Sequence, residues 1–261
     1  MAYYSPRLIG GAAQDAPLPR SGLATFLAVL LALACLGAAL GYALFGSDVI
    51  GDLKRAAVWI RVDGGERTGS GAIITPDGYV LTSAGVVKDG GAQSIEVILN
   101  SGSKDSNTLS AQITEHVGSS TDSSPQGAGK DYALLKIESE QALPCLPVVR
   151  SDNITEGNHC FIAGFPDMQT SIMGPNIKID RGSIGRIDRG GDQGALTFHT
   201  DIASYSGMQG APLTNDRGQI VGIITLHHVI ADRSSGAAVQ EVSALGVPTS
   251  RFSHVWEGLM R

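Results

Sequence analysis

The sequence predicts an all-β domain preceded by one transmembrane helix, and three observations lead to this prediction. Glycine accounts for 34 of the 261 residues, while aromatic residues make up only 5%, a composition that suits many tight turns. Beyond Ile50, short apolar stretches alternate with turn signals, which is typical of a β-barrel or sandwich. Before that point, one long apolar run from Ser21 to Ser47 contains no charged residue.

We expect residues 21–47 to form a retained membrane anchor behind a short polar tail, residues 1–20. A helix needs about 20 apolar residues to span a bilayer, whereas the apolar region of a cleaved signal peptide has about 7–15. Positive charges flank the run on both sides, so the positive-inside rule does not decide the orientation.

A linker, residues 48–56, is expected to lead into a β domain formed by residues 57–261. Its strands are predicted at residues 57–62, 71–74, 79–82, 95–99, 109–113, 132–137, 160–164, 196–199 and 220–226. Residues 76–78 and 215–218 have the sequences Pro-Asp-Gly and Asn-Asp-Arg-Gly and predict hairpin turns, because proline presets φ and glycine takes the positive φ. Residues 118–129 resemble a surface loop, and residues 249–261 predict a short amphipathic helix.

Composition excludes some classes of function. The net charge of −6 disfavours nucleic acid as a partner, because phosphate binding needs a basic surface. Three cysteines are too few for a disulfide framework. Cys35 lies in the apolar run, and Cys145 and Cys160 either pair or remain free thiols. We find no cluster of metal ligands, so neither a metal nor another cofactor is predicted.

Three landmarks in a fixed order carry a resemblance to a known family. Residues 69–87 read as strand, turn and strand; residues 131–137 are Asp-Tyr-Ala-Leu-Leu-Lys-Ile; and residues 207–213 are Gly-Met-Gln-Gly-Ala-Pro-Leu, followed by a hairpin at residues 218–223. Together they resemble the HtrA branch of the trypsin-like serine proteases over residues 57–256. The resemblance implies two packed β-barrels with a C-terminal helix, and we expect no PDZ domain to follow them.

The catalytic positions of that family are degenerate in this chain. Acyl transfer needs a hydroxyl nucleophile, an imidazole that accepts its proton and a carboxylate that orients the imidazole. Alignment on the family's motifs places Gly85 at the histidine position and Gln209 at the serine position, and only Asp131 is retained. Glycine has no side chain to accept a proton, and a carboxamide is not a useful nucleophile.

The same alignment gives expectations for the remains of this site. Gly207 and Gln209 fall at oxyanion-hole-like positions, and we expect the Gln209 side chain to lie over that hole and to form hydrogen bonds with the backbone near Gly207 and Gly210. Asp131 is expected to be held by the hydroxyl of Ser83 or by nearby backbone N–H groups.

The double loss predicts a pseudoprotease, a serine protease homologue without activity. Such a membrane-anchored domain would be a scaffold that binds a protein or an extended peptide, or a subunit of a complex with other membrane proteins. The alternative is an active serine endopeptidase with a displaced nucleophile such as Ser206. By resemblance, the chain is expected in a bacterial inner membrane, with its domain in the periplasm or an equivalent compartment.

Overall fold

The computed structural model describes residues 30, 31, 33, 48–118, 131–167, 170–171, 174–189, 195–230 and 241–259. The chain divides into two compact units, residues 1–46 and 47–261, and every described strand belongs to the second. The predicted tail and nearly all of the predicted anchor lie outside the described residues, as does the predicted loop after Gly118. Within the described part of the chain, no helix is long and apolar enough to cross a membrane.

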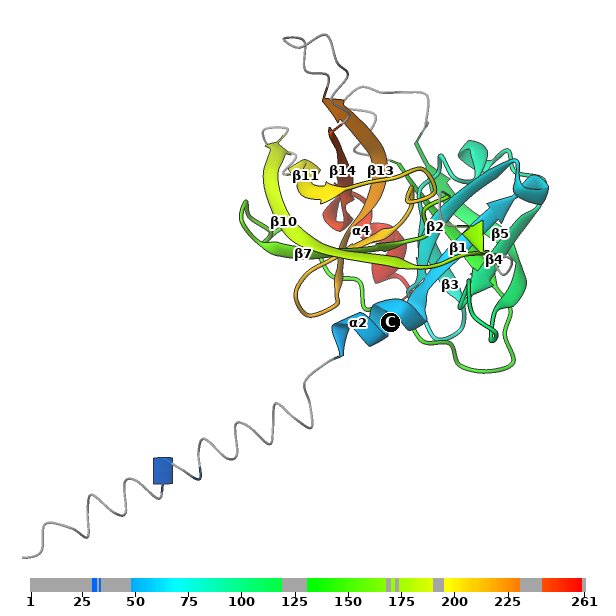
Figure 1. The fold of residues 1–261 in the computed structure, drawn as a ribbon, viewed down its shortest axis with the longest axis horizontal. Helices are drawn as coiled ribbons and strands as arrows, with labels where there is room; N and C mark the ends of the chain where they lie inside the picture. The colour runs from blue at the N-terminus through cyan, green and yellow to red at the C-terminus, as the bar shows by residue number, and fades with distance from the viewer. Residues whose placement is uncertain are drawn as a thin grey trace, which may run out of the picture. The chain divides into compact units, whose positions relative to one another are not determined.

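Six strands close into the first barrel in the order β1-β2-β3-β6-β5-β4. Figure 1 shows the labelled strands β1 to β5 gathered together. They are β1 (Ala57–Val62), β2 (Arg67–Ile73), β3 (Tyr79–Thr82), β4 (Ile95–Leu99), β5 (Asn107–Val117) and β6 (Tyr132–Ile137). The β2–β3 hairpin turns at Gly78, whose φ is 99° and whose N–H donates to Thr75 O at 3.1 Å. Apolar side chains such as Ile60, Val80 and Leu135 fill the interior and are fully buried.

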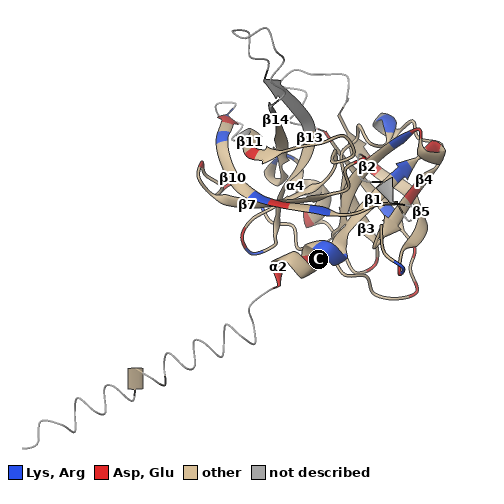
Figure 2. Ribbon diagram, viewed as in Figure 1, with Lys and Arg blue, Asp and Glu red and all other residues tan. Residues whose placement is uncertain are grey.

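A second barrel closes in the order β10-β11-β14-β13-β12-β7. Its strands are β7 (His159–Gly164), β10 (Lys178–Arg189), β11 (Ala195–Ala203), β12 (Pro212–Thr214), β13 (Ile220–Ile230) and β14 (Glu241–Pro248). Between β7 and β10 lies a small hairpin of β8 (Thr170–Ser171) and β9 (Gly174–Pro175). Acidic and basic residues are interspersed along β10 in Figure 2, the pattern of a solvated strand face.

Helical segments at both ends of the domain pack against a shared core. Residues 49–56, expected within a linker, form helix α2 (Val49–Ala56), whose first turn is capped by Asp48 Oδ1 accepting from Gly51 N at 3.0 Å. Leu53 of this helix is fully buried in the same apolar cluster as Phe252 and Trp256. Two 3-10 turns, η1 (Asp63–Gly65) and η2 (Lys88–Gly90), complete the first barrel.

The C-terminal helix is shorter than expected. A 3-10 turn, η4 (Thr249–Phe252), leads into the five-residue helix α4 (Ser253–Glu257), instead of one helix over residues 249–261. The predicted apolar face is nevertheless buried, because Phe252, Val255 and Trp256 pack into the shared core. Cys145 and Cys160 are free thiols, and Cys160 is buried.

Candidate functional site

The loop that carries Gln209 joins β11 to β12 and contains two glycines at positive φ, 89° at Gly207 and 84° at Gly210. A Cβ at Gly210 would lie 2.1 Å from Thr82 Oγ1 and 2.2 Å from Ser70 O. Real atoms do not approach so closely, so only glycine lets this loop of the second barrel lie against the first barrel.

Ser70 of β2 fastens this loop to the first barrel. Its buried hydroxyl donates to Gly207 O at 2.7 Å and accepts from Phe165 N at 2.9 Å. Its backbone N–H donates to Gln209 O at 2.8 Å. The backbone on either side of Met208 is therefore held in place from the opposite barrel.

The three positions that the sequence assigned to the triad, Gly85, Asp131 and Gln209, are brought together around Ser83. Ser83 Oγ donates to Asp131 Oδ2 at 2.7 Å and accepts from Gln209 Nε2 at 3.1 Å and from Gly85 N at 3.2 Å. Gly85 N also donates to Asp131 Oδ1 at 3.1 Å. A hydroxyl has one donor and two acceptor sites, so Ser83 is fully satisfied and links Gln209, the predicted nucleophile position, to Asp131.

Asp131 is held as the sequence led us to expect, but Gln209 is not. The Asp131 side chain is only 4% exposed, and its charge is offset by the donors from Ser83 and Gly85. The expectation that Gln209 would bond with backbone near Gly207 and Gly210 was wrong, because its carboxamide donates to Ser83 Oγ. The backbone N–H groups of Gly207 and Gln209, the oxyanion-hole-like positions, donate to no protein group in the part of the chain that the structure describes.

A cleft of about 550 Å³ lies in front of this network. It is lined by Trp59, Gly65, Glu66, Arg67, Thr68, Asp167, Pro175, Ser206, Gly207 and Gln209. Arg67 Nη1 donates to Gly85 O at 2.5 Å, so a fixed cation stands beside Gly85, the predicted histidine position. Asp167 accepts from Thr68 Oγ1 at 2.5 Å and from Ser206 Oγ at 2.7 Å.

Sequence reasoning missed Arg67 and Asp167. Neither lies inside a recognisable motif, and Asp167 meets Thr68 across 99 residues of sequence. The one available signal was position, since Arg67 precedes the first landmark by two residues and Asp167 directly follows a Gly-Phe-Pro turn.

No histidine is found among the cleft-lining side chains that the structure describes. His199 lies on β11 and pairs with Asp188 Oδ2 of β10 at 2.6 Å. Burial acts to raise the pKa of Asp188, but hydrogen bonds from His199 and Arg186 outweigh it and the pKa is lowered. The side chains of His227 and His228 lie outside the described residues. No group of three or more His, Cys, Asp or Glu suited to a metal ion occurs in the described ranges.

Two closed β-barrels with a triad-like cluster between them define a trypsin-like peptidase domain. Residues 69–223, more than half of the chain, match the trypsin-like peptidase domain family. The chain belongs to this family, and its relatives place it in the HtrA-type branch.

Three comparisons illustrate that placement. The chain is 30% identical over 166 residues to the serine protease HTRA1 of Xenopus laevis, covering 61% of this chain and 31% of the relative. It is 28% identical over 192 residues to the mitochondrial serine protease HTRA2 of Bos taurus, covering 70% and 38%. The solved structure of the HtrA-type protease AlgW with a tripeptide superposes with a TM-score of 0.59 at 26% identity, covering 82% of this chain and 63% of that chain. The chain thus spans less than two thirds of the length of these proteins.

Proposed function

We propose that this chain is a membrane-anchored pseudoprotease, a catalytically inactive trypsin-like domain that binds a protein or an extended peptide. One observation carries the proposal. The side chain at the nucleophile position is a carboxamide, and it donates to Ser83 Oγ at 3.1 Å, in a cluster where position 85 has no imidazole.

The magnitude of the loss argues against proteolysis. In subtilisin, removal of the nucleophile or of the base alone lowers kcat by about 10⁶-fold, because the two act as a unit. Here both groups are replaced, and the retained carboxylate is bonded to Ser83 and Gly85 instead of an imidazole. Hydrolysis at a useful rate does not follow from such a site.

The cleft beside Gln209 supports a binding function. Its polar lining offers Arg67 and Glu66 beside hydroxyls and backbone groups of the Gln209 loop. The related AlgW structure was solved with a tripeptide. This supports an extended peptide as the class of ligand for this chain. The apolar run of residues 21–47 supports a membrane anchor. We place the domain in the periplasm or an equivalent compartment, bound to another membrane protein or to an extended segment of one.

The runner-up is a serine endopeptidase with Ser206 as the nucleophile. What favours it is the hydrogen bond of 2.7 Å from Ser206 Oγ to the Asp167 carboxylate. Asp167 also accepts from Thr68, however, and no imidazole among the described cleft-lining residues is placed to take the proton of Ser206. We therefore favour the inactive domain.

Fluorophosphonate labelling of the full chain in mild detergent separates the two functions. We expect no covalent adduct on the wild-type protein and no cleavage of unfolded casein above background, while fluorescently labelled casein is bound and remains intact. An adduct that disappears in Ser206→Ala would establish the displaced nucleophile.

Restoring the missing groups gives a positive control. The double variant Gly85→His with Gln209→Ser is expected to recover weak labelling, whereas either substitution alone is not, because nucleophile and base act together. Robust casein turnover by the Gly85→His variant alone would contradict the role assigned to Gln209.

A further inference from the structure

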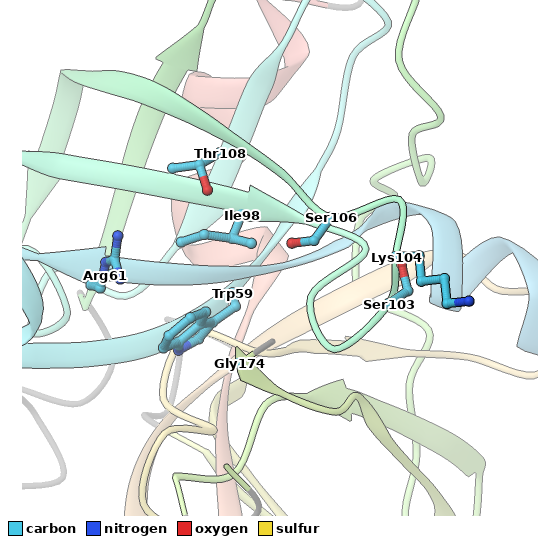
Figure 3. Close-up of a pocket in the computed structure, with 8 residues that line it drawn as sticks. All are labelled: Trp59, Arg61, Ile98, Ser103, Lys104, Ser106, Thr108 and Gly174. Carbon is cyan, nitrogen blue, oxygen red and sulfur yellow. The ribbon is translucent and has the colours of Figure 1, made fainter. Parts of the chain in front are cut away.

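A second cavity of about 680 Å³ adjoins the cleft (Figure 3). Trp59 lines both cavities. Gly174 lines the second cavity, and its neighbour Pro175 lines the cleft. A bound peptide that runs along the cleft past Gln209 therefore reaches the second cavity by passing over Trp59.

The floor of this cavity is one row of side chains across three strands. Trp59 of β1 pairs with Ile98 of β4, which pairs in turn with Thr108 of β5. Arg61 stands two residues beyond Trp59 and so lies on the same face of β1. Figure 3 shows these side chains on the sheet, with Lys104 on the turn that joins β4 to β5.

Gly174 closes the side of the cavity next to the cleft. Its φ is 96°, and a Cβ there would lie 3.2 Å from the indole ring of Trp59 and 2.8 Å from Ser101 Oγ. Glycine thus lets strand β9 approach the face of the indole closely. The indole Nε1 is buried and has no hydrogen-bond partner among the described residues.

The lining is rich in hydrogen-bond donors and positive charge. Its described side chains are Arg61, Lys104, three hydroxyls from Ser103, Ser106 and Thr108, and the apolar Trp59 and Ile98, with no carboxylate among them. Arg61 Nε donates to Glu96 Oε2 at 2.7 Å, outside the lining. None of its other N–H groups bonds to a residue that the structure describes.

Lys104 adds a second cation. Its side chain is exposed, and its ammonium makes no hydrogen bond or ion pair with the described residues. Arginine and lysine are donors only, so apart from the Arg61 Nε bond to Glu96 their N–H groups have no acceptor among the described residues.

We propose that this cavity is a carboxylate-binding subsite at the end of the peptide cleft. The proposal rests on the proposed function and names the class of ligand. Arg61 matches the planar carboxylate with its guanidinium, Lys104 supplies a second charge, and Trp59 packs against the residue that carries the carboxylate. Two sources share this chemistry, the C-terminus of a peptide and an Asp or Glu side chain.

Three pools of fluorescent octapeptides test the proposal. All have randomised sequences without internal Asp or Glu. The first pool ends in a free carboxylate, the second in an amide, and the third in an amide with Asp as its last residue. Binding to the full chain in mild detergent is measured by fluorescence anisotropy at fixed salt. We expect the first or third pool to bind about tenfold more tightly than the second, the gain typical of one charge-assisted hydrogen-bonded contact. Tighter binding of the first pool identifies the peptide C-terminus as the source of the carboxylate, and tighter binding of the third pool identifies an acidic side chain.

Variants assign that preference to the cavity. Arg61→Gln and Lys104→Gln are each expected to remove most of the preference, and their remaining binding of the second pool shows that they fold. Arg217→Gln, which removes an exposed cation from the β12–β13 turn, is the control and keeps the full preference.

The failures are distinguishable. Equal binding of all three pools by the wild-type chain, or a preference that survives in both cavity variants, would overturn the subsite and leave the peptide-binding function standing. Absence of binding by every pool would contradict the proposed function itself, and the subsite with it.

Discussion

Replacing Asp131 with alanine tests whether this carboxylate is structural. The side chain is 4% exposed and accepts from Ser83 Oγ at 2.7 Å and from Gly85 N at 3.1 Å. In Asp131→Ala both donors lose this acceptor, and an orphaned buried donor costs about 1–3 kcal/mol.

Two effects keep the loss of stability in Asp131→Ala near the cost of one orphaned donor. Gly85 N retains its contact of 3.2 Å with Ser83 Oγ, so of these two donors only the Ser83 O–H loses its acceptor altogether. Removing a buried charge also recovers part of its desolvation free energy. We therefore expect a loss of about 2 kcal/mol in the free energy of unfolding, within about 1–3 kcal/mol. For a domain of this size that lowers Tm by about 4–8 °C.

Thermal unfolding of the full chain, followed by tryptophan fluorescence, measures this change. Asp216→Ala, which removes an exposed carboxylate from a turn, is the control and should leave Tm within experimental error. Octapeptide binding should be the same in the wild-type protein and in Asp131→Ala. A variant with unchanged Tm that no longer binds peptide would refute this reasoning and make the carboxylate functional.

Further predictions concern the backbone and two titrating side chains. Gly210→Ala should destabilise the protein by more than about 2 kcal/mol in urea unfolding, whereas Gly157→Ala should cost only about 1 kcal/mol. Both glycines have positive φ, but a Cβ at Gly157 meets nothing within 4 Å. A hydrogen bond from Lys88 lowers the pKa of Asp63 to about 2, so its NMR carboxyl signal should titrate near pH 2. The stability gained from this lowered pKa should be present above about pH 4 and lost as pH falls towards 2. Burial raises the pKa of Cys160 to about 12, so iodoacetamide at pH 8 should modify this thiol only after unfolding, as peptide mass spectrometry would show; modification in the native protein would contradict its burial.

Strands with strong apolar patterns were predictable from the sequence alone. β1, β3, β4 and β6 have the predicted bounds, because their residues are mostly apolar and turn-forming residues flank them, except where β1 directly follows helix α2. β10 was not predicted as a strand, since only two of its twelve residues are buried and its sequence mixes Gly, Arg and Asp. Its place is fixed by pairing with β7 and β11, which are distant in the sequence.

The site was predictable in its residues but not in its geometry. Alignment brought Gly85, Asp131 and Gln209 to one place, and the structure joins them through Ser83. The direction of the Gln209 carboxamide depends on which neighbour has a free acceptor site, and sequence patterns carry no information about that. The donor-rich cavity around Arg61 depends on strand register and on a turn, so no sequence motif predicts it.

The attachment of Ser70 to the loop of the opposite barrel has a consequence for how the protein forms. Ser70 Oγ and Gly207 O are joined across 137 residues of sequence. Contacts of such long sequence separation form late, because the loop-closure entropy must be overcome before they stabilise anything. During synthesis all strands of the first barrel are made long before Gly207 leaves the ribosome. Until then the Ser70 hydroxyl has no acceptor from that loop. We therefore expect the Gln209 region to be the last part of the domain to gain protection from hydrogen exchange.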